Sequence, residues 1–249
     1  LKNGKIDTAI YKKIKSDEFP YRVADSMYIR KDYPEIIMNK IIESPLNKKK
    51  EYVYSDLGMY LMMKLIEEVS GKSFELYLQE NFYNPLGMGF TGFLPRTKFT
   101  LNQIVPTEID TVWRKQLIHG DVHDQGAAMM GGICGHAGLF SNAYNLATML
   151  QMLLQKGEYA GKQYFKKATV EEFTKYQNPE KNNRRGLGFD KPALSKNENG
   201  PCCKSASSLS YGHSGFTGTY FWVDPATNFI FIFLANRVHP DASNRKLIE

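Results

Sequence analysis

The sequence predicts an α+β fold, with an antiparallel sheet flanked by helices and joined to a helical region. Apolar residues recur at helical spacing within residues 57–176, and two β-rich runs form a late hairpin within residues 216–234. No stretch alternates strands with helices in the way that parallel βαβ units require. The sequence therefore argues against a doubly wound sheet.

The helical region carries clear start and stop signals. Ser55 or Asp56 can cap a helix over residues 57–69, and Gly71 is its expected stop. Three further helices are expected: 74–82 after Ser73, 143–155 after Ser141 and Asn142, and one that ends near Tyr176 after Thr169.

The sheet is expected in the C-terminal third. Residues 216–223 and 229–234 are β-rich, and residues 224–228 join them with a proline at the second turn position. We place this hairpin in the core of a sheet whose strands lie within 186–236. The polar residues 1–50 are expected to form a surface segment with short helices. Residues 1–249 are thus expected to form one domain, mainly helical over 57–176.

Composition excludes several classes of function. The 249 residues are 42% hydrophobic and 23% charged, which is ordinary for a globular protein, and the net charge of +6 is mild. Basic residues are scattered, and clusters such as Lys48–Lys50 and Arg184–Arg185 are expected on solvated faces, so no nucleic-acid partner is expected. No stretch approaches the ~18 apolar residues of a membrane span. No cofactor or metal is expected.

The triplet His213-Ser214-Gly215 precedes the hairpin. A glycine here would let a ligand approach the backbone, and a strand edge can bind a peptide by strand addition. The amide of Phe216 could then face a developing oxyanion. Taken alone, the triplet is more simply an ordinary strand entry.

A second element, Tyr54-Ser55-Asp56, opens the first helix. A tyrosine beside a helix N-terminus lies where the helix dipole stabilises anionic groups, although a tyrosine base also needs cationic neighbours at neutral pH. Taken alone, this element is more simply an N-cap beside a buried aromatic residue.

The two elements in this order, with their surroundings, resemble the serine β-lactamase and penicillin-binding protein superfamily, in its class C β-lactamase and esterase-like branch. The stretches that carry the resemblance are Tyr54–Gly58, Asn84–Met88, Gly135–Ser141, Gly186–Phe189 and Gly212–Gly215. The resemblance runs from about residue 50 to the C-terminus and implies a β-lactamase/DD-peptidase-like fold. Residues 122–141 and 236–240 more specifically resemble bacterial versions attached to family 3 β-N-acetylglucosaminidases.

The resemblance implies catalytic roles for Tyr54, His213 and Phe216. Tyr54 matches the tyrosine that assists proton transfer, His213 belongs to the strand that matches Lys-Thr-Gly, and the Phe216 amide would complete the oxyanion hole. Ser214 and Gly215 would contact substrate, with Ser214 holding a carboxylate or carbonyl.

Two positions depart from the family pattern. Asp56, a further substrate-binding candidate, stands where many relatives have asparagine and places a charge beside the substrate. His213 stands where β-lactamases usually have lysine, which weakens the permanent positive charge. Both departures favour a reaction other than efficient β-lactam hydrolysis.

The nucleophile motif Ser-x-x-Lys is missing from its expected place before Tyr54. Of fourteen serines, only Ser243 has a lysine three positions later, Lys246, and this pair lies in a polar tail. We expect the true motif upstream of Leu1, a domain truncated at both ends, and a fragment that is inactive alone. Such truncation should leave apolar edges bare, which predicts self-association.

The resemblance implies a serine hydrolase or acyl-transferase that acts on peptidoglycan-derived peptides, D-amino-acid amides or esters through an acyl-enzyme. It also implies an exported or periplasmic location. The alternative is a non-catalytic module that binds cell wall or docks beside a β-N-acetylglucosaminidase.

Two other constellations compete. A metal site is conceivable from the cluster of His119, Asp121, His123 and Asp124, with His136 following, but loop capping is favoured because no HExxH or CxxC spacing is present. Residues 212–216 nearly spell the Gly-x-Ser-x-Gly elbow of α/β-hydrolases. That elbow needs a helix after the serine, and here a strand is expected.

Overall fold

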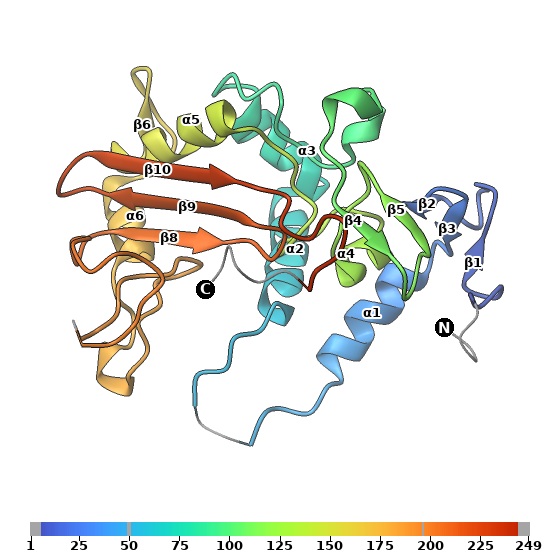
Figure 1. Ribbon diagram of the computed structural model, residues 1–249, viewed down its shortest axis with the longest axis horizontal. Helices are drawn as coiled ribbons and strands as arrows, with labels where there is room; N and C mark the ends of the chain where they lie inside the picture. Colours follow the sequence, from blue (N-terminus) through green and yellow to red (C-terminus); the bar gives the residue numbers. More distant parts are fainter. Residues whose placement is uncertain (1–5, 49–50, 196, 244–249) are drawn as a thin grey trace. The chain divides into compact units, whose positions relative to one another are not determined.

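The computed structural model describes residues 6–48, 51–195 and 197–243 and shows a mixed helix and strand protein (Figure 1), which confirms the α+β prediction. The chain divides into two compact units. Unit 1 comprises Leu1–Asn81, Thr91–Phe140 and Asn236–Glu249, and unit 2 comprises Phe82–Phe90 and Ser141–Ala235.

Unit 1 begins with a small antiparallel sheet of three strands, β1 (Tyr11–Lys12), β2 (Tyr21–Ala24) and β3 (Met27–Ile29), in the order β1-β3-β2. Helix α1 (Tyr33–Ile42) follows. The prediction of a surface segment with short helices is therefore wrong in part, because this segment also forms three strands and buries Val23, Ala24 and Ile29 in the core. Strands of two to four residues are too short to show the alternation that identifies a strand in a sequence.

Helix α2 (Leu57–Ser70) is the longest helix of unit 1 in its described part and has the predicted ends. Asp56 is its N-cap residue, and Gly71 ends it in the left-handed conformation, with φ of 65°. The next helix, α3 (Phe74–Leu78), starts where Ser73 accepts a hydrogen bond from the Leu76 amide at 3.4 Å. A π-helical turn over Gln79–Tyr83 continues it.

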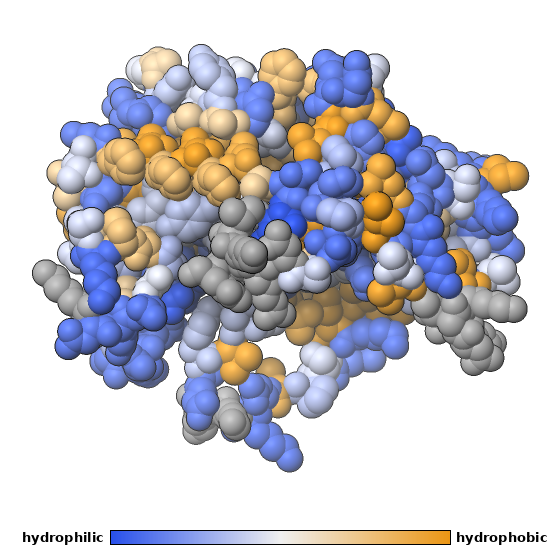
Figure 2. Space-filling view, viewed as in Figure 1, coloured by the Kyte–Doolittle hydropathy of each residue, from blue (hydrophilic) through white to orange (hydrophobic). Residues whose placement is uncertain are grey.

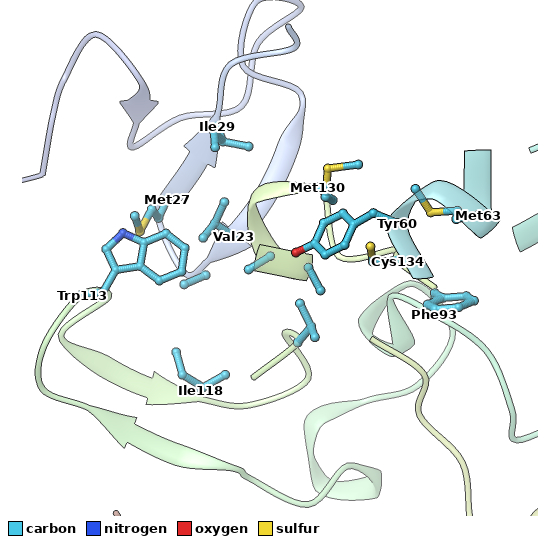
Figure 3. Packing of buried hydrophobic residues seen from close by; sticks show 14 of the residues in the cluster. Val23, Met27, Ile29, Tyr60, Met63, Phe93, Trp113, Ile118, Met130 and Cys134 are labelled. Carbon is cyan, nitrogen blue, oxygen red and sulfur yellow. The ribbon is translucent and has the colours of Figure 1, made fainter. Parts of the chain in front are cut away.

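The remaining elements of unit 1 are short: 3-10 turns at Pro95–Thr97 and Leu101–Gln103, the antiparallel pair β4 (Glu108–Asp110) and β5 (Gln116–Ile118), and α4 (Gln125–Met129). Buried residues from the small sheet, α2, α4 and the loops form one hydrophobic core (Figure 3). Tyr60 lies within this core, with its hydroxyl directed toward α4.

Unit 2 contains helix α5 (Ala143–Leu154), whose N-cap Asn142 accepts a hydrogen bond from the Asn145 amide at 2.8 Å. This start agrees with the prediction. Two short strands and a helix follow: β6 (Glu158–Tyr159), β7 (Lys162–Gln163), α6 (Lys167–Thr174), and then a 3-10 turn at Pro179–Lys181.

The predicted cap of α6 is wrong. The helix begins at Lys167, after Lys166, and Thr169 already lies in its first turn, where its amide donates to the Lys166 carbonyl at 2.9 Å. Lys166 supplies no side-chain cap. A helix that starts without a capping side chain leaves no local signal for its first residue.

The sheet of unit 2 contains β8 (Tyr211–Ser214), β9 (Thr219–Asp224) and β10 (Phe229–Leu234), antiparallel in the order β10-β9-β8. Helix α5 packs on one face, where Leu150, Tyr211 and Val223 form a buried cluster. β9 begins at residue 219 because residues 215–218 form a tight turn, closed by the Gly218 amide and the Gly215 carbonyl at 3.0 Å.

The placement of the hairpin in the core of its sheet is wrong. β10 is the end strand of this sheet in the described chain. Phe229, Phe231 and Phe233 are 55%, 45% and 41% exposed, on the face opposite α5, and Figure 2 shows this hydrophobic stretch along β10. Six apolar residues in a row predict burial on both faces, but α5 covers only one.

In the described part of the chain, no helix combines the length and the apolar character that crossing a membrane requires.

Candidate functional site

The triplet His213–Gly215 lies at the end of β8. His213 pairs with Phe221 and Ser214 with Tyr220 of β9. His213 is half-buried, whereas Ser214 is exposed. The triplet thus presents one partly shielded and one open side chain.

Glycine in this strand is required by the sheet itself. A Cβ at Gly215 would overlap the Thr219 hydroxyl, and one at Gly212 would overlap the Phe221 carbonyl and the Trp222 ring. The Gly215 amide also donates to the Thr219 carbonyl at 2.7 Å. Packing within unit 2 therefore explains both glycines without any ligand.

The outer edge of β8 is closed at one residue. The Asp190 amide donates to the Gly212 carbonyl at 2.8 Å, and the Gly212 amide donates back at 3.0 Å. The turn Gly186–Phe189, closed by a 3.0 Å bond from the Gly186 amide to the Phe189 carbonyl, brings Asp190 to this edge. The stretch Gly186–Phe189 thus brings the residues on either side of it, Arg185 and Asp190, beside β8.

Those flanks are charged. Arg184 and Arg185 both lie beside the Asp190 carboxylate, at 3.0 Å and 3.4 Å, and one guanidinium nitrogen of Arg185 lies 2.8 Å from Nε2 of His213. The Arg185 side chain is only 16% exposed. The expectation that Arg184–Arg185 form a solvated face is therefore wrong for Arg185, which lies against His213, whereas the Arg184 side chain is 41% exposed.

A buried lysine lies next to this cluster in the sequence. Lys191 is 1% exposed, donates to the Ser210 carbonyl at 2.8 Å and lies over the Tyr176 ring, 4.7 Å from its centroid. Burial lowers the pKa of Lys191 to about 8, against a smaller opposing effect of the Asp224 carboxylate.

Phe216 lies in the turn that follows the triplet, and its side chain is 66% exposed. That its amide faces an oxyanion stays a prediction. A turn and strand β9 follow Ser214, where a nucleophile elbow would need a helix, which agrees with the rejection of an α/β-hydrolase elbow.

In unit 1, Tyr54–Asp56 form the non-helical entry to α2. Tyr54 is 56% exposed. The Ser55 hydroxyl accepts from the Leu57 amide at 3.3 Å, whereas the Asp56 side chain makes no cap hydrogen bond. The Asp56 carboxylate is therefore not used to hold the helix end.

A polar network of His136 and Asp124 packs against Tyr60 of α2. His136 stacks on Tyr60, and its Nε2 lies 2.9 Å from the Asp124 carboxylate, which also accepts from the Ala127 amide at 2.7 Å. Burial alone would lower the pKa of His136, but Asp124 and the neighbouring Cys134 raise it to about 10. Burial raises the pKa of Tyr60, with Cys134 and Asp124 adding to it.

Glycines allow this network to pack. A Cβ at Gly135 would overlap the Met59 carbonyl, and one at Gly126 would overlap the Tyr60 hydroxyl. Gly138, with φ of 106°, has no room beside the Gly132 carbonyl. Gly126 and Gly135 therefore let their segments pack directly against α2, and Gly138 packs against Gly132.

The His and Asp cluster caps loops. His119 bonds the Ile104 carbonyl at 2.5 Å, Asp121 pairs with Arg22 at 2.7 Å and His123 pairs with Glu108 at 2.8 Å. Within residues 6–48, 51–195 and 197–243, no three His, Cys, Asp or Glu side chains are grouped to hold a metal.

The predicted site residues fall into two groups. Tyr54 and Asp56 belong to unit 1, and His213, Ser214, Gly215 and Phe216 belong to unit 2. That both groups face one cleft stays a prediction. Lys246 of the serine–lysine pair lies outside the described residues, as do Lys49 and Lys50.

Sequence reasoning missed Arg185 and Asp190 as neighbours of His213, and their only signal was that they flank the stretch Gly186–Phe189. It grouped Asp124 with His136 as loop-capping residues but did not predict that they pair.

Comparisons with known proteins agree on one family. The family model described as Beta-lactamase matches residues 16–249. A "Putative D-alanyl-D-alanine carboxypeptidase" of Salmonella gallinarum is 33% identical over 228 residues, which is 84% of this chain and 51% of the relative. The Escherichia coli K12 protein of that name is 33% identical over 233 residues, 87% of this chain and 52% of its own length. The chain thus spans about half the length of these curated relatives.

Solved structures show the same fold. Unliganded simvastatin synthase from Aspergillus terreus has a TM-score of 0.57 at 17% identity, covering 82% of this chain and 54% of the synthase. A penicillin-binding protein homologue from Caulobacter crescentus has a TM-score of 0.51 at 19% identity, covering 78% and 54%. With its family model matched over residues 16–249 and this fold, the chain belongs to the β-lactamase family.

Proposed function

We propose that this chain is part of a serine hydrolase or acyl-transferase that acts on peptidoglycan-derived peptides, D-amino-acid amides or esters through an acyl-enzyme. The observation that carries the proposal is the ordered pair of elements in a β-lactamase family chain: Tyr54–Asp56 at the start of α2, and His213–Gly215 at the end of β8. The names of the relatives support a D-alanyl-D-alanine substrate.

Each element has a role in this proposal. Tyr54 assists proton transfer, and Ser214 and the Phe216 amide hold the carboxylate or carbonyl and the oxyanion of the substrate. Asp56 places a carboxylate where a neutral amide would bind a β-lactam side chain, which favours substrates other than β-lactams. An exported or periplasmic location belongs to the same proposal, since such substrates lie outside the cytoplasm.

The nucleophile is the missing part. The one Ser-x-x-Lys pair in residues 1–249 is Ser243 with Lys246, after β10 rather than before Tyr54. We therefore predict that residues 1–249 alone form no acyl-enzyme. Mass spectrometry after incubation with a fluorophosphonate or a penicillin tests this, and a covalent adduct on the chain would contradict it.

The full-length gene product provides the positive test. It should be labelled by a fluorescent penicillin or a fluorophosphonate and should release D-alanine from a peptide ending in D-Ala-D-Ala. Tyr54→Phe should lower the rate about 100-fold or more, as loss of general acid–base catalysis does. Tyr52→Phe is the matched control, because Tyr52 is 54% exposed and Tyr54 is 56% exposed. Absence of labelling and of D-alanine release would refute the proposal.

The second candidate is a non-catalytic module that binds cell wall or docks beside a β-N-acetylglucosaminidase. Residues 1–53 contain no Ser-x-x-Lys, so the given sequence is compatible with this candidate as well as with the enzyme. Reading the upstream gene sequence discriminates the two, because a Ser-x-x-Lys there restores the enzyme and a glycosidase domain supports the module. Co-sedimentation with purified peptidoglycan then measures binding directly.

A further inference from the structure

The imidazole of His213 has a hydrogen-bond partner at each nitrogen. Nε2 lies 2.8 Å from a terminal guanidinium nitrogen of Arg185, and Nδ1 lies 2.7 Å from the Ser214 carbonyl oxygen. The three residues all belong to unit 2.

The chemistry of the two partners decides the state of the ring. A guanidinium carries only donors, so Nε2 of His213 must accept with its lone pair. A carbonyl oxygen only accepts, so Nδ1 must carry the proton. The arrangement therefore selects the neutral Nδ1–H tautomer. A doubly protonated ring would direct an N–H against the N–H and the positive charge of Arg185.

Arg185 is held in place before any ligand arrives. Its carbonyl accepts from the Gln177 amide at 3.0 Å, and its amide donates to the Asn183 side chain at 3.0 Å. The Asp190 carboxylate lies 3.4 Å from the guanidinium. Asp190 is itself paired through its backbone with Gly212 of β8. The guanidinium therefore reaches His213 from a backbone fixed on both sides.

We propose that Arg185 is a positioning residue that acts through His213, holding the imidazole as the neutral Nδ1–H tautomer so that His213 fixes the Ser214 carbonyl. In this arrangement Arg185, and not His213, provides the permanent positive charge at the end of β8. Both ring nitrogens are occupied, so His213 takes no part in proton transfer. The role in catalysis rests on the proposed function, whereas the tautomer does not.

The tautomer can be read directly from residues 1–249. Long-range ¹⁵N–¹H spectra of protein labelled with ¹⁵N-histidine, at pH 7, distinguish a protonated Nδ1 from a protonated Nε2 in a neutral ring. His213→Asn identifies the signals of His213 among the five histidines. The Nδ1–H form should exceed the other by about tenfold or more, since a hydrogen bond to a charged group is among the strong ones.

Three variants test whether Arg185 causes the tautomer preference of His213. Arg185→Met removes the donors at similar length and should abolish the tenfold preference. Arg185→Lys keeps a charged donor and should restore it. Arg184→Met removes a neighbouring guanidinium that contacts Asp190 at 3.0 Å and should leave the tautomer unchanged. Near-ultraviolet circular dichroism shows that each variant keeps its tertiary structure.

The outcomes separate this inference from the proposed function. An Nε2–H ring in the parent chain, or an unchanged tautomer in a folded Arg185→Met variant, overturns the inference whatever the activity. If the full-length protein is active, Arg185→Met should lower acylation about tenfold and Arg185→Lys should recover most of it. If the full-length protein is inactive, the proposed function fails and the tautomer result still stands.

Discussion

The imidazole of His136 lies nearly parallel to the ring of Tyr60, with centroids 4.5 Å apart and an interplanar angle of 23°. Tyr60 belongs to α2, which begins directly after Tyr54–Asp56. Because His136 also pairs with Asp124, this stack joins the start of α2 to the N-cap of α4. The candidate tyrosine of unit 1, Tyr54, thus precedes a helix that a half-buried charged pair supports.

The pair should give unit 1 a pH-dependent stability. The pKa of His136 is raised from 6.5 to about 10, so its contribution is complete below pH 6.5 and is lost as the pH rises through about 10. The pKa of Asp124 is lowered from 3.8, so its contribution is complete above pH 3.8 and is lost below it.

Asp124→Asn tests this contribution, because asparagine still caps α4 but removes the charge. It should destabilise the protein by about 1–3 kcal/mol at pH 6, less than fully buried pairs because Asp124 is 40% exposed. Urea unfolding at pH 6, 8 and 10 measures the difference, which should shrink toward pH 10. A difference that is constant over this range would contradict the assignment.

Gly135→Ala should destabilise the protein by about 1–3 kcal/mol, because the new methyl group would overlap the Met59 carbonyl of α2 and the backbone must move. The matched control is Gly58→Ala in the first turn of α2, where the added Cβ has no atom within 4 Å. That control should be neutral or stabilise by up to about 1 kcal/mol. Thermal unfolding of both variants checks the pair, and equal effects would disprove the packing argument.

Lys191 should act in the opposite direction to His136. Its pKa is lowered from 10.5 to about 8, so the unfolded chain binds more protons between these values and stability rises with pH there. Lys191→Met removes this dependence. The parent should therefore gain stability over the variant from pH 8 to 10.5, by up to about 1.4 kcal/mol per pH unit. Denaturant unfolding of the parent and the variant at three pH values measures this difference, and a difference that does not change with pH would show that burial does not lower the pKa of Lys191.

The uncovered face of β10 should drive self-association. Phe231 and Phe233 are 45% and 41% exposed on the face away from α5. The double variant with Phe231→Thr and Phe233→Thr keeps strand-forming residues while it removes apolar area. Sedimentation velocity should show oligomers of the parent chain and fewer for the variant. A monodisperse parent monomer would count against the prediction.

The sequence predicted those elements whose ends carry their own chemistry. Ser55, which accepts from the Leu57 amide, and Gly71 bound α2, Asn142 starts α5, and the proline-containing turn after Asp224 joins β9 to β10. Each of these signals is local, so it can be recognised in the sequence without knowledge of the tertiary structure.

What the sequence did not predict depends on contacts between distant positions. β1, β2 and β3 have too few residues to show a period, and the exposure of β10 depends on what covers the sheet. The contact of Arg185 with His213 joins residues 28 positions apart, and it exists only because the turn Gly186–Phe189 returns the chain to β8. The roles expected of Tyr54 and Ser214 came from the resemblance to the family. The sequence could not predict the geometry around these two residues.

The backbone pairing of Asp190 with Gly212 has a consequence for any guest peptide. In unit 2 this pairing already occupies the outward-facing amide and carbonyl of Gly212, so an extended guest could begin to pair with β8 only past that residue. Of β8, Ser214 remains before the turn at Gly215, and its carbonyl already lies 2.7 Å from Nδ1 of His213. Such a short docking edge suits the last one or two residues of a chain rather than its middle.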